Sequence, residues 1–131
     1  MSATSKLNIL IVAGTRERLQ MAAMTASVAA VSGTEVRILL SMNALPYFVK
    51  NRAAEPPPEG EFGRTMEGKK VPPFKQLLES AVELGEAKIH PCAMAMDVLA
   101  LTPAEVDDFL APPQGLTKFL SDGADAQWLT F

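Results

Sequence analysis

The chain contains one cysteine and one histidine, and both lie in the segment 86–101, EAKIHPCAMAMDVLAL. Lys88 begins a short run that is typical of a strand, His90-Pro91-Cys92 ends it, and an apolar helical run follows directly. The first amides of a helix have no partner within the helix and lie at the positive end of its dipole, which favours a thiolate. The pattern therefore predicts a nucleophilic sulfur at Cys92.

The neighbours of Cys92 in this segment are candidates for stabilising its anionic forms. Residues two apart on a strand project to the same face, so Lys88, His90 and Cys92 share a face if the strand stays regular. His90 is then a candidate for tuning the thiol. The helix amides at Ala93 and Met94 are candidates for binding an anionic adduct on the sulfur.

Structural roles for the same residues stay open. Pro91 interrupts the strand ladder and could rotate Cys92 away from the face of His90. A lone cysteine is often a small buried hydrophobe, and a histidine often hydrogen-bonds only to backbone or solvent. Asp97 would complete a hydrolytic triad with these two residues. Five positions separate it from Cys92, however, which argues against direct contact with the sulfur.

Several cofactor signatures are absent from the sequence. It has neither GxGxxG nor GxxxxGK[ST], so Gly14-Thr15 is at most a generic anion-binding turn between a strand and a helix. There is no CxxC pair of the kind that thioredoxin-type exchange needs, and one cysteine with one histidine does not supply a zinc or iron site. We expect no metal and no resident cofactor.

The rest of the chain supplies a sheet for the strand that ends at Cys92. Aliphatic or β-prone runs occur at 6–13, 35–41 and 126–131, and helical patterns occur at 16–32, 73–85, 93–101, 102–110 and 115–122. The fourth helical pattern opens with a capping box, Thr102-Pro103-Ala104-Glu105. This alternation predicts a single α/β domain over residues 1–131. The sheet is expected to be mostly parallel, with about four to five strands and helices on both faces in flavodoxin- or Rossmann-like layering.

Residues 50–72 break the alternation. The segment contains Pro56-Pro57-Pro58, three glycines and mixed charges, with almost no apolar periodicity. We expect a long insertion loop that is either a lid, a partner-binding segment or disordered. Its basic residues are largely cancelled by glutamates, so a basic patch is only weakly indicated. The run 93–101 is apolar on nearly every side, so either this loop or another subunit is expected to cover it.

Composition restricts the class of protein. A length of 131 residues suits one domain, and 48% apolar with 21% charged residues is typical of a soluble globular protein. The net charge of −3 gives no general attraction to nucleic acid. The first apolar run is too short to span a membrane or to serve as a secretion signal. Together with the single cysteine, this predicts a cytoplasmic protein with no membrane partner.

The sequence resembles the DsrE/DsrF-like sulfur-relay proteins. The resemblance covers nearly the whole chain apart from 50–72, and it lies mainly in the run 88–99, KIHPCAMAMDVL. It also includes the aliphatic first strand, the Ala/Met-rich helix after Gly14, and the runs GTEVRI at 33–38 and GADAQ at 123–127.

The resemblance implies a small cytoplasmic α/β protein, commonly a trimer or hexamer, that carries sulfur as a cysteine persulfide or related adduct. The family's carrier cysteine corresponds to Cys92. The partners that it implies are a TusA-type sulfur carrier protein and, in sulfur oxidisers, a heterodisulfide-reductase-like enzyme system. Some members have a second cysteine near the first. Here any disulfide has to form with another molecule, because the chain has no second cysteine.

Residues and resemblance together lead to the hypothesis of a sulfur carrier. The Cys92 thiolate attacks sulfane sulfur on a donor or accepts a thiosulfonate group, and it holds the sulfur until an acceptor thiol takes it. One alternative is a non-catalytic oligomeric binding module with an inert Cys92, in which the Gly14 turn or the junction pocket holds a small anion. Another is a thiol enzyme such as a hydrolase or peroxidase, for which His90 is the available base.

Overall fold

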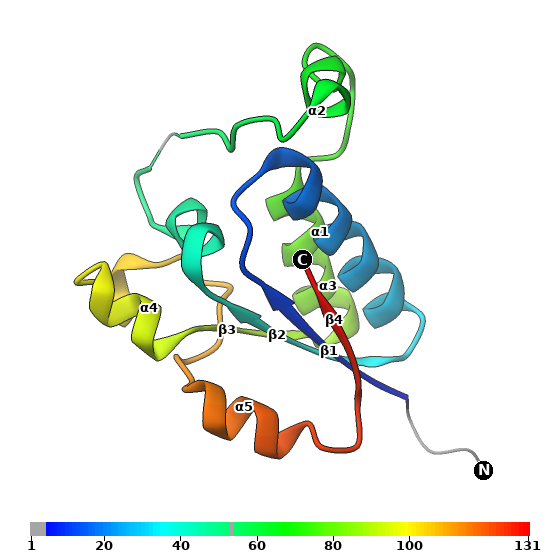
Figure 1. Cartoon of the computed structure of the whole chain (residues 1–131). Coiled ribbons are helices and arrows are strands. Elements are labelled where there is room, and N and C mark those ends of the chain that lie inside the picture. Colours follow the sequence, from blue (N-terminus) through cyan, green and yellow to red (C-terminus); the bar gives the residue numbers. More distant parts are fainter. Residues whose placement is uncertain (1–4, 53) are drawn as a thin grey trace.

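The computed structural model describes residues 5–52 and 54–131 and contains a four-stranded, all-parallel sheet (Figure 1). The strands are β1 (Lys6–Ile11), β2 (Glu35–Leu40), β3 (Lys88–Pro91) and β4 (Gln127–Thr130), in the order β3-β2-β1-β4. β1 and β2 follow the aliphatic runs of the sequence, because a strand covered on both faces needs apolar side chains at successive positions. The prediction of a single α/β domain with a mostly parallel sheet is confirmed.

Helices cover both faces of this sheet (Figure 1). α1 (Arg16–Val31) and α3 (Phe74–Gly85) pack against each other on one face. A Cβ atom at Gly85 would lie 2.5 Å from the Cβ of Ala30, so a glycine is needed where these two helices approach most closely. α5 (Leu116–Asp122) lies on the opposite face.

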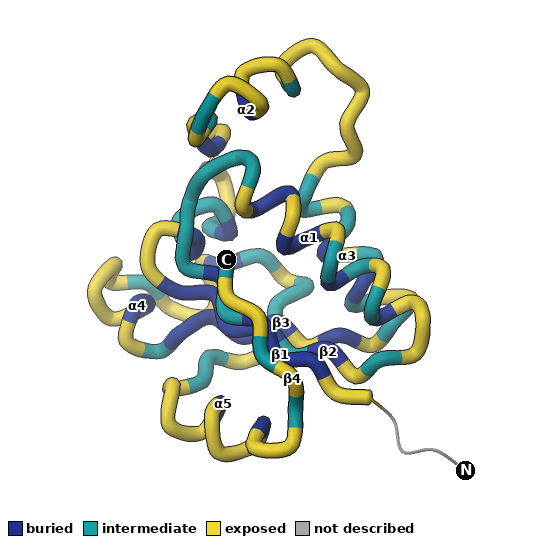
Figure 2. The backbone as a smooth tube through the Cα atoms, turned by 45° about the vertical axis from the view of Figure 1, so that its right-hand side comes forward, coloured by how far each residue is buried: buried dark blue, intermediate teal, exposed yellow. Residues whose placement is uncertain are grey.

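The α5 face is held by aromatic packing and one arginine. Phe119 of α5 is fully buried and meets Trp128 of β4 edge to face, with ring centroids 5.7 Å apart. The guanidinium of Arg37 on β2 lies 4.6 Å from the centre of the Phe119 ring. Figure 2 shows the distribution of burial, with most of β1 to β3 buried at the centre, most of α5 exposed, and both buried and exposed residues along α4.

Residues 50–72 contain a short helix, α2 (Glu61–Thr65), and the first turns of α1 hold the segment in place. The carboxylate of Glu17 accepts backbone hydrogen bonds of 2.8 to 3.1 Å from the N–H groups of Glu59, Gly60 and Gly63. These bonds, that from Glu59 first, lower the pKa of Glu17 below its ordinary value, against the opposing effect of burial. Side chains on α1 thus supply the hydrogen bonds that the segment does not make with itself.

The helix expected over 102–110 forms only one turn. The capping box is present, with the Thr102 N–H and the Glu105 carboxylate 3.0 Å apart, but it starts a 3₁₀ turn, η2 (Pro103–Glu105), that goes no further. Val106 is extended and forms an antiparallel bridge with Val49. Its neighbours hydrogen-bond with the chain around Val49 in the same way, so cross-chain pairing replaces the helix.

The helix after Cys92 is also shorter than the expected 93–101. α4 spans Ala93–Val98, and Ala100 then adopts a left-handed φ of 54°. The N–H of Leu101 returns to the carbonyl of Met96 at 2.9 Å and closes the helix. A non-glycine residue ends α3 as well, because Glu86 is left-handed at φ 58° and Gly85 remains helical. In both helices the left-handed residue that ends the helix is not a glycine.

Candidate functional site

Cys92 lies at the junction that the sequence predicts, as the N-cap residue of α4 directly after β3. Its N–H donates to the carbonyl of Leu40 on β2 at 2.7 Å, and its own carbonyl accepts from the N–H of Met96 at 2.9 Å. The sheet therefore continues one residue past Pro91, so the proline does not disrupt the pairing. The cysteine is positioned at the carboxyl end of a parallel strand, where open α/β sheets place their ligands.

The thiol is nearly enclosed. Cys92 is 4% exposed and belongs to the hydrophobic core. An extended segment, residues 111–114, runs along the outer edge of β3 and hydrogen-bonds to Ile89, Pro91 and Ala93 at 2.8 to 3.0 Å. Cys92 therefore lies at the predicted junction but has little direct access to solvent, and its role as a nucleophile stays a prediction.

Only one of the two predicted helix amides is left to bind an anion. The N–H of Ala93 donates to the carbonyl of Gln114 at 2.9 Å, so it is already used within the fold. No partner of the Met94 N–H is found among the described residues. The Met94 side chain is 50% exposed. Binding of an adduct at Ala93 would require this bond to Gln114 to break, and both amide assignments stay predictions.

His90 is held by the edge segment and not by the cysteine. Its Nδ1 lies 2.7 Å from the carbonyl oxygen of Pro112, and since a carbonyl only accepts, Nδ1 carries the proton. Burial lowers the pKa of His90; Arg37 and Lys88 add to this, while the bond to Pro112 and the charge of Asp122 oppose it. The ring is therefore neutral near pH 7. In the part of the chain that the structure describes, no hydrogen bond joins it to Cys92.

Gly14 has a packing role at the end of β1. A Cβ atom there would clash with the carbonyl oxygen of Asn43, in the 3₁₀ helix η1 (Met42–Phe48). The preceding N–H groups, of Val12 and Ala13, both donate to the carbonyl of Phe131. Close approach of two loops accounts for this glycine, and its suggested role in anion binding stays a prediction.

Met42 has an unusual backbone conformation that sequence reasoning missed. It follows β2 two positions after Leu40, the hydrogen-bond partner of Cys92, and its φ of 51° is left-handed. Such a conformation costs free energy in a non-glycine residue and often marks a functional position. Met42 is 55% exposed. Methionine is not a residue type that favours a left-handed backbone, so the sequence does not indicate this conformation.

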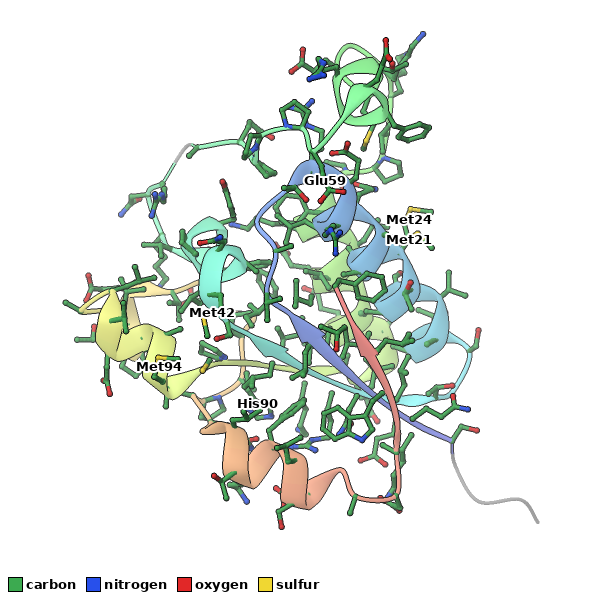
Figure 3. All side chains as sticks on the ribbon, viewed as in Figure 1. Met21, Met24, Met42, Glu59, His90 and Met94 are labelled. Atoms are coloured by element: carbon green, nitrogen blue, oxygen red, sulfur yellow. The ribbon has the colours of Figure 1, made fainter. Side chains whose placement is uncertain are left out.

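The outer face of α4 is uncovered. Val98 is 73% and Leu99 40% exposed, and Met94 and Met42 lie near the same edge of the molecule (Figure 3). Residues 54–72 extend away over the start of α1 and do not cover this face (Figure 1). Of the two covers that the apolar sequence calls for, the loop is therefore ruled out in this structure. A surface for another chain remains.

β3, Cys92 and α4 all lie in a part of the sequence that matches the model of a known family. A model of the DsrE/DsrF/DrsH-like family matches residues 59–131, more than half of the chain. The chain belongs to the DsrE/DsrF/DrsH-like family. The match also takes in residues 59–72, which the sequence resemblance had left out.

Solved structures of this kind share the whole fold. The protein of unknown function MTH1491 from Methanobacterium thermoautotrophicum aligns over 97% of this chain and 99% of its own, with a TM-score of 0.69 and 4% identity. The ychN protein from E. coli aligns over 98% and 100%, with a TM-score of 0.64 and 14% identity. At these identities the likeness concerns the fold alone. A search of curated proteins finds no match.

Within residues 5–52 and 54–131, no group of three or more His, Cys, Asp or Glu side chains is arranged to bind a metal ion. Among the same residues, none of the helices has the length and apolar character needed to span a bilayer.

Proposed function

We propose that this member of the DsrE/DsrF/DrsH-like family is a sulfur carrier that binds sulfane sulfur or a thiosulfonate group on Cys92 and passes it to an acceptor thiol. The observation that carries the proposal is the position of the chain's one cysteine at the N-cap of α4, at the carboxyl end of β3, inside the family match. That position combines a ligand-binding edge of the sheet with a helix start.

For sulfane sulfur the transfer is an exchange that balances without an outside oxidant. The Cys92 thiolate attacks the outer sulfur of a donor persulfide, the donor S–S bond breaks, and the donor leaves as a thiolate with the electron pair. Cys92 now carries a persulfide. An acceptor thiolate attacks its outer sulfur in turn and Cys92 leaves as thiolate. The Met94 N–H is the group that we propose to bind the terminal anion, and we assign His90 to tuning the thiol.

Because Cys92 is 4% exposed, loading requires a local opening. α4 has only six residues, and the side chains of Met94 and Val98 on it are half or more exposed. Displacing it exposes the two core side chains that it contributes, Ala95 and Met96, and short segments of this kind open at lower free energy than the whole domain unfolds. We propose that a partner seated on the outer face of α4 displaces the helix and reaches the sulfur.

The proposed partners are those that the resemblance to the DsrE/DsrF-like proteins implies. A TusA-type sulfur carrier protein is the proposed acceptor or donor, and a heterodisulfide-reductase-like system is the proposed downstream enzyme. The exposed apolar side chains on α4 and α5 also suit assembly of the chain into a homo-oligomer, a trimer or hexamer. A cytoplasmic location is part of the proposal, because a persulfide carrier with one free cysteine needs a reducing compartment.

The enclosure of Cys92 favours a second candidate, a non-catalytic binding module in which the cysteine is a core residue. Both candidates are tested by the intact mass of the native protein after incubation with thiosulfate, tetrathionate or polysulfide. The carrier gains the mass of bound sulfur, which dithiothreitol removes, and Cys92→Ser gains nothing. A native protein that gains nothing, yet is alkylated on Cys92 once unfolded, is the module.

A further inference from the structure

A second apolar surface lies on α1, away from Cys92. Four of its exposed side chains are apolar and spaced three, four and three residues apart: Met21, Met24, Val28 and Val31. This spacing places them in one row about 15 Å long on the helix surface. Met21 and Met24 project side by side from α1 in Figure 3. An uncovered row of this kind on a helix is typical of a seam that packs against a second helix.

The segment held by Glu17 forms a wall beside one end of this row. Phe62, Met66 and Val71 line a groove with Met21 and Met24, and its volume is about 400 Å³. We call this surface, including Val28 and Val31, the α1 groove. Three of its side chains are methionines, which adapt to different apolar partners because they are flexible and polarisable.

The openness of the α1 groove decides between a small ligand and a helix. Small-molecule sites bury about 70–90% of their ligand. Here Phe62 is 74% exposed and Met21 54% exposed, so the side chains that line the groove face solvent and would not enclose a small molecule. A helix laid along the row would cover these same side chains and would extend over Val28 and Val31.

The charges beside the groove select the partner. Lys69 lines it, and Arg64 and Lys70 lie on the same segment; none of the three forms an ion pair within residues 5–52 and 54–131. Glu59 and Glu67, which would balance them, are paired with Arg18 and Arg16. Between positions 61 and 70 this leaves Glu61 against three basic side chains, so this stretch of the wall carries net positive charge, while Glu17 lines the groove from the α1 side.

A second copy of the chain does not match this charge. α1 is the helix with a row of this length, and its carboxylate, Glu17, is already bonded to three backbone N–H groups. Its remaining charges are arginines. α3 exposes one large apolar side chain, Leu84, and α4 and α5 are seven residues or shorter. We propose that the α1 groove binds an acidic amphipathic helix of a different protein, by a surface independent of Cys92.

The first test uses a designed probe with the full chain. A fluorescein-labelled peptide of about 20 residues carries leucines at the spacing of the α1 row and glutamates beside them, and binding is read by anisotropy. We expect Met24→Glu to weaken binding by at least about tenfold. Leu120→Glu on α5 is the matched control, because Met24 and Leu120 are both 46% exposed, and it should bind like the wild type.

The second test reverses the charge. Lys69→Glu should lower the affinity for the acidic peptide by about threefold or more. It should raise the affinity for the same peptide with lysines in place of glutamates. This arm does not depend on Met24→Glu folding. The proposal is overturned if both peptides bind the wild type equally, if neither binds, or if Leu120→Glu loses as much as Met24→Glu. Sedimentation showing that Met24→Glu dissociates an oligomer that excludes the peptide would assign the groove to a second copy.

Discussion

Residues 50–72 and the segment around Cys92 both differ from what their sequences suggest, the first in its order and the second in its accessibility. The first is rich in proline, glycine and charge, yet Glu17 fixes it by three backbone hydrogen bonds. The second has the pattern of an accessible reactive cysteine, yet Cys92 is 4% exposed, while the apolar side chains of Met94 and Val98 on α4 are exposed to solvent. Order in one region comes from a distant side chain. In the other, the proposed sulfur transfer requires a local opening.

The largest effect should follow from removing the anchor of residues 50–72. Glu17→Ala leaves the N–H groups of Glu59, Gly60 and Gly63 without their acceptor, so we expect their hydrogen-exchange protection to fall by about a hundredfold or more. Amide exchange by NMR measures this directly. Glu79→Ala, an exposed glutamate of α3, is the control and should leave these amides protected. Unchanged protection in Glu17→Ala would mean that something else orders the segment.

A matched pair of charges should separate the two surfaces. Val98 on α4 and Phe62 beside α1 are 73% and 74% exposed, so Val98→Glu and Phe62→Glu should both change stability by less than about 0.5 kcal/mol. Val98→Glu should slow sulfur transfer to an acceptor protein by about tenfold, because the partner meets a charge on α4.

Phe62→Glu should leave sulfur transfer unchanged and weaken the acidic helix at the α1 groove. Transfer rates by mass spectrometry and peptide binding by anisotropy give both readouts on the same preparations. Equal effects of the two variants on transfer would show that the surfaces are not independent.

The smallest effects should come from acid, which should destabilise the two regions in different pH ranges. The pKa of His90 is lowered on folding, so the unfolded chain binds more protons below its ordinary value of 6.5, and stability falls as the pH drops through that range. The pKa of Glu17 is lowered from 4.5, so its contribution is complete above 4.5 and is lost as the pH falls below it. Thermal unfolding across pH should therefore show a loss near pH 6 that His90→Gln removes. Proteolysis of residues 50–72 should increase only below about pH 4.5.

The sheet and α1 could be predicted because their signals are local. The aliphatic runs of β1 and β2 and the position of Cys92 before α4 need no knowledge of distant residues. The features that were missed depend on distant partners. Val106 pairs with Val49 and is extended instead of helical. The N–H of Ala93 donates to the carbonyl of Gln114. Met42 has a left-handed backbone, which its residue type does not indicate.

The account depends most on sulfur leaving Cys92 for another thiol. The decisive measurement is a single-turnover mixture of the sulfur-loaded protein with a TusA-type carrier, followed by intact mass of both proteins with time. We predict that the added sulfur disappears from Cys92 and appears on the acceptor cysteine, with no transfer from Cys92→Ser. A loaded protein that keeps its sulfur in the presence of the acceptor, or one that cannot be loaded while folded, would contradict the relay.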